Sequence, residues 1–279
     1  MVTQQEQLPA VAFIGAGSMG GAILQGLVAS GIPVAGGIRA VNRTEDKAAT
    51  LRRPGVLSLA YETVDDATER ALDGAKLVVL GVKPAGIRDV LEEIRPMLDP
   101  DAVVVSIAAG VTIGTMEAIV PNPVVRTMPN TPSTVGRGIT GIAPGTRATA
   151  SIVALVSRLF ETVGSVLVLP ESRMDALSAI SGSGPAYVYL LIERLTEAAQ
   201  RLGFGAEEAR LLAEGTFIGA TALLEADDAG PAELRRRVTS PKGTTERAIA
   251  VLEEADLAGL FERAAAAAIA RAKELAADA

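Results

Sequence analysis

The chain has 279 residues, of which 49% are hydrophobic, and its formal net charge is −7. A single hydrophobic core usually stops growing at about 250–300 residues, so this length favours two domains. The basic residues are scattered along an acidic chain, which excludes the concentrated basic footprint that a nucleic-acid partner requires. Aromatic residues make up only 3% and Trp is absent, so no aromatic platform for nucleic-acid bases is expected.

Cysteine and histidine are both absent. Their absence excludes disulfides, thiolate nucleophiles, Cys/His zinc sites and a Ser-His-Asp triad. We therefore expect no bound metal and no side chain acting as general acid or base, and the difficult step would belong to a cofactor. The two longest charge-free runs, 7–38 and 176–192, contain Gly and Pro and follow no export signal. Neither is expected to cross a membrane, and a cytoplasmic location is predicted.

The first half of the chain alternates short apolar runs with helical stretches. Buried strands are predicted at 11–14, 77–80, 103–106, 123–126 and 166–169, and a further strand is predicted to end near 40–41. Helices are predicted at 20–30, 44–53, 64–71, 87–97, 112–119 and 148–163. Strands this apolar, separated by helices, indicate an α/β fold: a Rossmann-type, doubly wound parallel sheet covered by helices on both faces.

After Leu169-Pro170 the strand pattern stops. Helices are predicted at 171–180, 185–202, 206–226, 231–237 and from 244 to near the C-terminus, with a break around residue 255. We place the domain boundary at Pro170/Glu171, which gives an N-terminal domain of residues 1–170 and an all-α domain of residues 171–279. Two of its helices carry apolar side chains on more than one face and must be covered nearly all round. This favours an intertwined dimer over a compact monomeric bundle.

The sequence Gly15-Ala16-Gly17-Ser18-Met19-Gly20 directly follows the first predicted strand and opens a helix. This is the context of the dinucleotide-binding fingerprint. Gly15 permits the tight turn, Gly17 lets the backbone approach a pyrophosphate, and Gly20 lets the helix pack on the strand. The pyrophosphate would then lie on amide groups at the N-terminus of the helix.

Asn42-Arg43-Thr44 follows the second predicted strand, where an NAD enzyme usually carries Asp or Glu for the ribose 2′-hydroxyl. Arg43 can instead grip a 2′-phosphate bidentately, which predicts NADPH, with NADH a weaker possibility. The alternative is that Thr44 caps a helix and Arg43 is a solvated surface residue, and the two roles are compatible. Lys83, in Gly81-Val82-Lys83-Pro84, follows the strand at 77–80 and is either a cofactor contact or an ordinary surface lysine.

Three polar segments, 128–132, 181–185 and 239–245, lie between predicted elements and are typical of turns and caps. The third reads Thr-Ser-Pro-Lys-Gly-Thr-Thr just ahead of a helix. Its small residues would leave backbone N–H groups pointing outward, which makes an anion cradle. A substrate carboxylate would fit there.

These motifs resemble, in order and spacing, those of pyrroline-5-carboxylate reductases over nearly the whole chain. The segments that carry the resemblance are 15–20, 82–84, 106–111, 128–130, 181–187 and 239–245. The resemblance implies a Rossmann domain followed by a helical dimerisation domain, with an active site between them that is partly shared across the dimer. It also implies NADPH-dependent reduction of Δ1-pyrroline-5-carboxylate to proline, the last step of proline biosynthesis. An iminium can arrive already protonated from water, so this reaction suits a protein without histidine.

The resemblance also implies the site residues. The NADPH site would be formed by Gly15, Gly17, Ser18, Met19, Asn42, Arg43, Val82, Lys83 and Ala109. The substrate carboxylate would bind at Ser240, Gly243, Thr244 and Thr245, with Glu171 near the pyrroline ring. Arg237 falls where the family approaches the cofactor, although the run Arg235-Arg236-Arg237 is also typical of a solvated helix face.

Two positions depart from the family pattern. Lys242 stands where the family usually has Gly, and if the position needs a positive φ the lysine carries about 1 kcal/mol of strain. Many members have an Asn that touches the cofactor about twenty residues before Val-Lys-Pro. This chain reads Ala60-Tyr61-Glu62 there, so that contact is not carried over.

Two other functions are compatible with a dinucleotide-binding domain followed by a helical domain. β-Hydroxyacid dehydrogenases share the two-domain plan but use a Lys early in the helical domain as an acid, and this chain has no Lys between Lys83 and Lys242. A non-catalytic NADP-binding regulatory protein is the alternative from another class. NADPH absorbance would fall on addition of pyrroline-5-carboxylate to an enzyme and would stay flat with a sensor.

Overall fold

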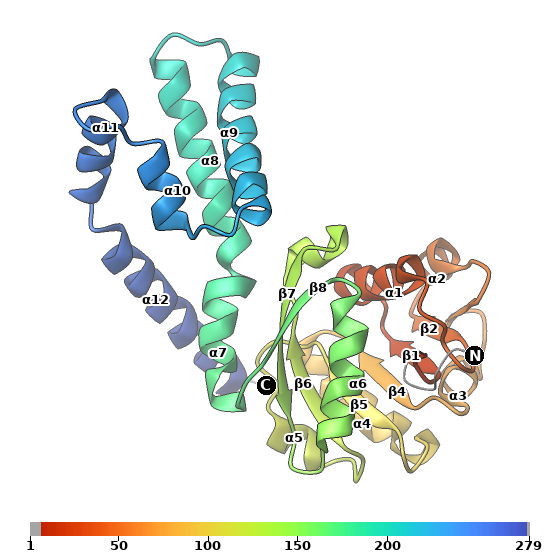
Figure 1. The fold of residues 1–279 in the computed structure, drawn as a ribbon. Coiled ribbons are helices and arrows are strands. Elements are labelled where there is room, and N and C mark those ends of the chain that lie inside the picture. Colours follow the sequence, from red (N-terminus) through yellow and green to blue (C-terminus); the bar gives the residue numbers. More distant parts are fainter. Residues whose placement is uncertain (1–6, 278–279) are drawn as a thin grey trace. The chain divides into compact units, whose positions relative to one another are not determined.

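The computed structural model describes residues 7–277, which fold into two compact units (Figure 1). The first unit runs to Gly182 and also includes the chain from Ala268 onward, whereas the second is Ser183–Ala267. The last strand ends at Val168, well before this division. The residues that follow it, up to Gly182, still pack with the first unit. Met174 and Leu177 belong to the same apolar cluster as Ala143 in the sheet. The boundary placed at Pro170/Glu171 thus marks where the strands stop, and the compact unit continues twelve residues further.

Among the described residues, eight strands form one sheet in the order β3-β2-β1-β4-β5-β6-β7-β8. The strands are β1 Val11–Ile14, β2 Ile38–Asn42, β3 Val56–Ala60, β4 Leu77–Leu80, β5 Val103–Ser106, β6 Val124–Met128, β7 Gly138–Pro144 and β8 Gly164–Val168. Neighbours are parallel except for β6 and β7. Ile14 pairs with both Val41 and Leu80, so β1, β2 and β4 end side by side. The strand order reverses at β1/β4, where doubly wound sheets bind ligands.

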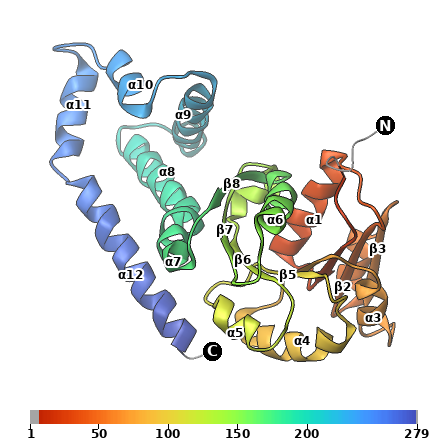
Figure 2. The same ribbon diagram turned by 60° about the horizontal axis from the view of Figure 1, so that its bottom comes forward.

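Helices cover both faces of this sheet (Figure 2). They are α1 Ser18–Ser30, α2 Glu45–Leu51, α3 Ala67–Leu72, α4 Ile87–Ile94, α5 Ile113–Glu117, α6 Ala150–Glu161 and the short α7 Met174–Leu177. Successive strand residues enter opposite cores. Val11 and Phe13 pack with side chains of α1 and α6, and Ala12 and Ile14 pack with side chains of α3, α4 and α5. The prediction of an α/β doubly wound sheet covered on both faces is confirmed.

Two strands, β3 and β7, were not predicted from the sequence. β7 contains two glycines and ends in proline, residue types that are depleted in strands. Packing explains both glycines, because a Cβ on Gly138 would clash with Ser133 and a Cβ on Gly141 would lie 2.7 Å from Cδ1 of Leu177. The single helix predicted at 171–180 was also wrong in detail, since a 3₁₀ turn, Glu171–Arg173, precedes α7 and a π-helical turn, Ser178–Gly182, follows it.

The second unit is helical, as predicted. It contains α8 Gly184–Arg201, α9 Ala206–Ala226, α10 Pro231–Arg237 and α11 Thr244–Glu253, and α12 Leu257–Ala277 begins within it. The predicted break near residue 255 separates α11 from α12. Large apolar side chains are exposed along its helices, among them Tyr189 (60%), Leu211 (73%) and Ile218 (67%). None of the helices in residues 7–277 combines the length and the apolar character needed to cross a membrane.

Candidate active site

The glycine-rich loop between β1 and α1 has the geometry that its three glycines predict. Gly15 has φ +83°, which a residue with a side chain rarely adopts. No atom lies within 4 Å of the position where a Cβ on Gly17 would stand, so the backbone there is open to a ligand. A Cβ on Gly20 would lie 3.1 Å from the carbonyl oxygen of Gly15. Gly81 completes the loop packing, because a Cβ there would clash with that same oxygen; this role was not foreseen from the sequence.

The N-terminus of α1 is suited to an anion. Its N-cap, Gly17, has no side chain to satisfy the first N–H groups, and no acidic residue lies in the first turn. Those N–H groups have no partner within the helix, and the helix dipole adds partial positive charge at this end. The side chain of Met19 packs on the core below. Met19 can therefore meet a ligand through its backbone.

A cavity of about 810 Å³ lies at the carboxyl ends of β1, β2 and β4. Its lining residues are Gly15, Gly17, Ser18, Val41, Asn42, Arg43, Lys47, Tyr61, Gly81, Val82, Lys83, Val90 and Glu93. Seven of the nine residues expected around NADPH are in this lining, and Met19 and Ala109 are not. Ala109 is exposed in the loop after β5. The order of the strands brings six residues that were not foreseen to the same edge: Val41, Lys47, Tyr61, Gly81, Val90 and Glu93.

Asn42 carries an unused hydrogen-bond donor. The residue is 3% exposed, and its Nδ2 has no hydrogen-bond partner in the described part of the chain. An unsatisfied buried donor costs about 1–3 kcal/mol, so an acceptor supplied by a ligand would stabilise the site. Arg43 and Lys47 line the same cavity. Thr44 is the N-cap of α2, but its side chain makes no capping hydrogen bond.

Lys83 adds a third cation to the cavity. Its backbone is extended, at φ −63° and ψ 150°, and Pro84 after it begins a 3₁₀ turn, as expected for a residue that precedes proline. Glu93 is the acidic residue of the lining. Three cations against one carboxylate favour a polyanionic ligand.

The predicted carboxylate cradle forms the start of α11 in the second unit. Gly243 is the N-cap, and its N–H donates to the carbonyl oxygen of Ser240 at 2.9 Å. The N–H groups of Thr244 and Thr245 then open the helix, where intrahelical acceptors are missing. Lys242 has φ 63°, which confirms that this position needs a left-handed backbone. Its N–H donates to Oε2 of Glu246 at 2.9 Å, which ties the turn to the helix.

Glu171 is part of a charged cluster in the first unit. Its Oε1 accepts from the N–H of Ile113 at 2.7 Å and pairs with Nη1 of Arg126 at 3.1 Å. The guanidinium is 9% exposed and also pairs with Asp175 at 3.4 Å. The cluster joins β6, the start of α5 and the chain around α7. Arg126 was not foreseen as a member of the site, because its partners lie more than 40 residues away along the chain.

Asn130 links two of the polar segments between the predicted elements, 128–132 and 181–185. Its Oδ1 accepts from the N–H of Ile139 at 2.8 Å, and its Nδ2 donates to the carbonyl oxygen of Ser181 at 2.9 Å. The residue is 7% exposed. The segments 128–132 and 181–185 are therefore held together on β7 by a single amide.

Comparison with known proteins identifies the family. Residues 171–275 match the family model described as pyrroline-5-carboxylate reductase dimerisation, and residues 10–110 match the one described as NADP oxidoreductase coenzyme F420-dependent. A pyrroline-5-carboxylate reductase of Pseudomonas aeruginosa is 41% identical over 271 residues, covering 96% of this chain and 97% of that one. The chain belongs to the pyrroline-5-carboxylate reductase family.

Solved structures of pyrroline-5-carboxylate reductases share this fold. The Coxiella burnetii enzyme superposes with a TM-score of 0.88 at 37% identity, covering 95% of this chain and 97% of that one. The Plasmodium falciparum pyrroline carboxylate reductase with NADP bound has a TM-score of 0.78 at 27% identity and covers 97% and 99% of the two chains. The alignments thus extend over both the nucleotide-binding half and the helical half of this reductase.

The basic run of α10 is engaged in ion pairs within the helical unit of this reductase. Arg237 pairs with Asp227 at 2.6 Å and with Glu233 at 3.1 Å, and Arg236 pairs with Glu233 at 2.7 Å. Hydrogen bonds from Arg236 and then Arg237 lower the pKa of Glu233 to about 2. Arg237 would have to exchange these partners to reach a cofactor.

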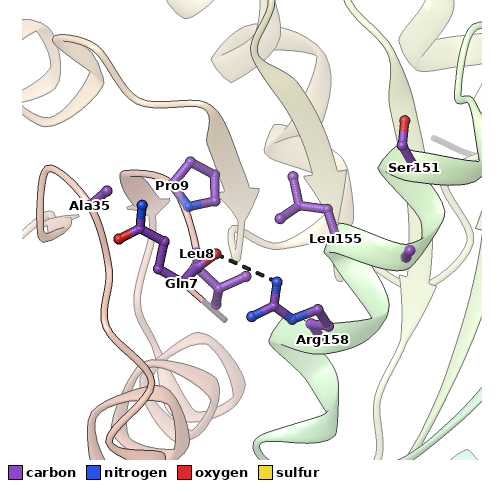
Figure 3. Close-up of a pocket in the computed structure, with 8 residues that line it drawn as sticks. Gln7, Leu8, Pro9, Ala35, Ser151, Leu155 and Arg158 are labelled. Carbon is purple, nitrogen blue, oxygen red and sulfur yellow. Dashed lines mark hydrogen bonds between the residues drawn. The ribbon is translucent and has the colours of Figure 1, made fainter. Parts of the chain in front are cut away.

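Another cavity, also about 810 Å³, precedes β1 at the opposite edge of the sheet (Figure 3). It is lined by Gln7, Leu8, Pro9, Ala35, Ser151, Ala154, Leu155 and Arg158. The Arg158 guanidinium points across it and donates to the carbonyl oxygen of Gln7 at 3.5 Å. None of the predicted site residues lines this cavity.

Proposed function

We propose that this chain is an NADPH-dependent reductase of L-Δ1-pyrroline-5-carboxylate that forms L-proline by hydride transfer to the C=N carbon, the last step of proline biosynthesis. The observation that carries the proposal is the cavity at β1, β2 and β4. It places the glycine loop, Asn42 and Arg43 together in a chain that matches reductases of this family over 96% of its length. The reaction is an oxidation–reduction at a carbon–nitrogen bond.

NADPH fits the residues present. The amides of Gly17, Ser18 and Met19 would hold the pyrophosphate at the start of α1, as glycine loops of this type do. The unpaired Nδ2 of Asn42 and the guanidinium of Arg43 would bind the 2′-phosphate. Val82 and Lys83 would border the ribose and phosphates from β4, and Ala109 would contact the cofactor from the loop after β5. When bound, the dihydronicotinamide supplies the hydride.

The protein's own part in the reaction is to position the substrate. The N–H groups and hydroxyls of Ser240, Gly243, Thr244 and Thr245 would hold the substrate carboxylate at the start of α11. Glu171 would lie near the pyrroline ring. Its two hydrogen bonds to residues in the range 7–277 both use Oε1, so Oε2 is the atom we assign to the substrate side. With no histidine, the iminium proton comes from water, and catalysis rests on orientation and electrostatics.

The chain also associates with itself through the helical unit. The family model that matches residues 171–275 is one of dimerisation. Large apolar side chains on α8 and α9 are exposed in a single copy, for example Tyr189 and Ile218, and burying such a surface drives association. A second copy is therefore the partner we assign to it. The cytoplasmic location inferred from the sequence stays a prediction.

The test is to follow NADPH absorbance on addition of pyrroline-5-carboxylate and to assay proline by chromatography. The expected result is a fall in absorbance that matches the proline formed mole for mole. A β-hydroxyacid offered with NADP⁺ provides the control for the alternative dehydrogenase activity and should give no NADPH. Tight NADPH binding with no turnover of the imine would favour a regulatory protein and overturn the proposal.

A further inference from the structure

Tyr61 lines the cofactor cavity at the carboxyl ends of β1, β2 and β4. It follows β3 directly, and it is the aromatic residue of the cavity lining. Tyr61 is 38% exposed, so it is not a residue of the hydrophobic core. The chain holds only three Tyr, five Phe and no Trp. Aromatic rings are therefore scarce, and one of them lines this cavity.

The backbone around Tyr61 is bound to the segment that carries Asn42 and Arg43. The N–H of Tyr61 donates to the carbonyl oxygen of Asn42 at 3.0 Å, and Asn42 pairs with Ala60 across β2 and β3. The next side chain, Glu62, accepts from the N–H of Glu45 at the start of α2. Tyr61 is thus fixed beside the residues that we assign to the 2′-phosphate.

The phenol is held at its polar end. Burial raises the pKa of the Tyr61 phenol above its ordinary value, the Thr68 hydroxyl hydrogen-bonds to it and opposes the rise, and the charge of Glu93 adds to it. The phenol is therefore neutral at physiological pH. Thr68 lies on α3 and Glu93 on α4, so the polar edge of the ring is directed toward these helices, while the residue still lines the cavity.

The position of the adenine follows from the chemistry of the nucleotide. The 2′-phosphate and the base are attached to neighbouring carbons of one ribose, so the base must lie within a few ångströms of the phosphate's binding residues. The lining that contains Asn42 and Arg43 also contains Tyr61, Val82 and Val90, and Tyr61 is bound through its backbone to Asn42. Both valines are partly buried against the core below. This patch offers an aromatic face and two aliphatic side chains to a flat, apolar ring.

We propose that the ring of Tyr61, flanked by Val82 and Val90, is the stacking platform for the adenine of the cofactor in this chain. The proposal rests on the proposed function, because it presumes an adenine dinucleotide with a 2′-phosphate bound at Asn42 and Arg43. Stacking of a base on an aromatic side chain depends little on which base it is, because every base presents a π-face, and it contributes to the binding free energy.

The experiment measures binding of adenosine 2′,5′-bisphosphate and of NADPH by titration calorimetry to the full-length protein. We expect Tyr61→Leu, which keeps apolar bulk but lacks a π-face, to raise both Kd values by about 5- to 30-fold, the lower part of the range for one base–aromatic stack. The matched variant Tyr61→Phe keeps the ring and should stay within about twofold of the wild type. Equal Kd values for Tyr61→Leu and the wild type would overturn the proposal.

A spectroscopic readout tests the same contact without depending on the stability of Tyr61→Leu. Since the chain has no Trp and three Tyr, tyrosine emission should be partly quenched when adenosine 2′,5′-bisphosphate binds. The quenching should disappear in Tyr61→Phe, which still binds, and should persist in Tyr189→Phe. Persistence in Tyr61→Phe would refute stacking on Tyr61 even if the proposed function holds. A wild-type protein that binds neither ligand would overturn the proposed function itself.

Discussion

Replacing Lys242 by Gly should make the protein more stable, because the backbone at this turn is left-handed. Its φ of 63° costs a residue with a Cβ about 1–2 kcal/mol, a penalty that glycine does not bear. Glycine also adds freedom to the unfolded chain, which offsets about 0.4–1 kcal/mol of that gain. We therefore expect Lys242→Gly to raise the free energy of unfolding by about 0.5–1 kcal/mol.

Lys242→Ala is the matched control for this prediction. It removes the same ammonium group but keeps the Cβ and its strain, and both variants retain the backbone N–H that donates to Glu246. The difference between them in urea unfolding, measured at one protein concentration because association shifts apparent stability, isolates the strain. If Lys242→Gly proves no more stable than Lys242→Ala, the left-handed turn carries no measurable cost and the reasoning is wrong.

The same pair of variants shows whether the ammonium of Lys242 reaches the substrate. If Lys242 is only a turn residue, both variants should keep the wild-type KM for pyrroline-5-carboxylate. A KM that rises equally in both, and rises more at low ionic strength, would mean that the charge attracts the substrate carboxylate. We expect the unchanged KM, because the side chain is exposed and the backbone already serves the cradle.

The remaining predictions concern the cofactor, the cradle and two ion-pair clusters. Arg43→Ala should lower the preference for NADPH over NADH by about 10- to 100-fold in kcat/KM, the contribution of one or two charge-assisted contacts, and an unchanged ratio would remove Arg43 from the 2′-phosphate site. Thr245→Ala should raise KM for the imine more than it lowers kcat, with a loss of about 1–2 kcal/mol in kcat/KM; a wild-type KM would contradict the cradle. The pKa of Glu233 is lowered to about 2 from 4.5, so its ion pairs stabilise the fold above pH 4.5 and are lost as the pH falls toward 2, and the Tm difference between the wild type and Glu233→Gln should shrink over that interval. Arg126→Met should destabilise the fold by about 1–3 kcal/mol in urea unfolding, less than for a fully buried pair because its two carboxylate partners are about one-third exposed; an unchanged midpoint would show that the cluster adds nothing.

The nucleotide-binding edge was predictable because its signals are local. A glycine loop between an apolar strand and a helix specifies where a pyrophosphate can lie, and parallel strands bring the ends of β1, β2 and β4 to one edge. Asn42 ends β2 and Lys83 lies three residues after β4, so their place in the cavity follows from the strand assignment. The left-handed turn at Lys242 was predictable for another reason, since the family pattern has glycine there.

Other features depend on contacts between distant parts of the chain. β7 pairs with β6 and β8 although its glycines and proline oppose a strand, because its neighbours in the sheet supply the hydrogen bonds. The partners of Arg126 lie 45 and 49 residues further along, and no local pattern indicates them. Tyr61 reaches the cavity only through β3, a strand that the sequence did not reveal, so its proximity to Asn42 could not be foreseen.

The division of the chain into units bears on the order in which it is made and folded. The first unit is interrupted at Gly182 and resumes at Ala268. At 5–20 residues per second, a ribosome needs on the order of 10 s to make the segment between. Throughout that time the nascent nucleotide-binding unit lacks its last helical portion. Removal of residues 268–277 would therefore shorten the nucleotide-binding unit, although these residues follow the helical unit along the chain.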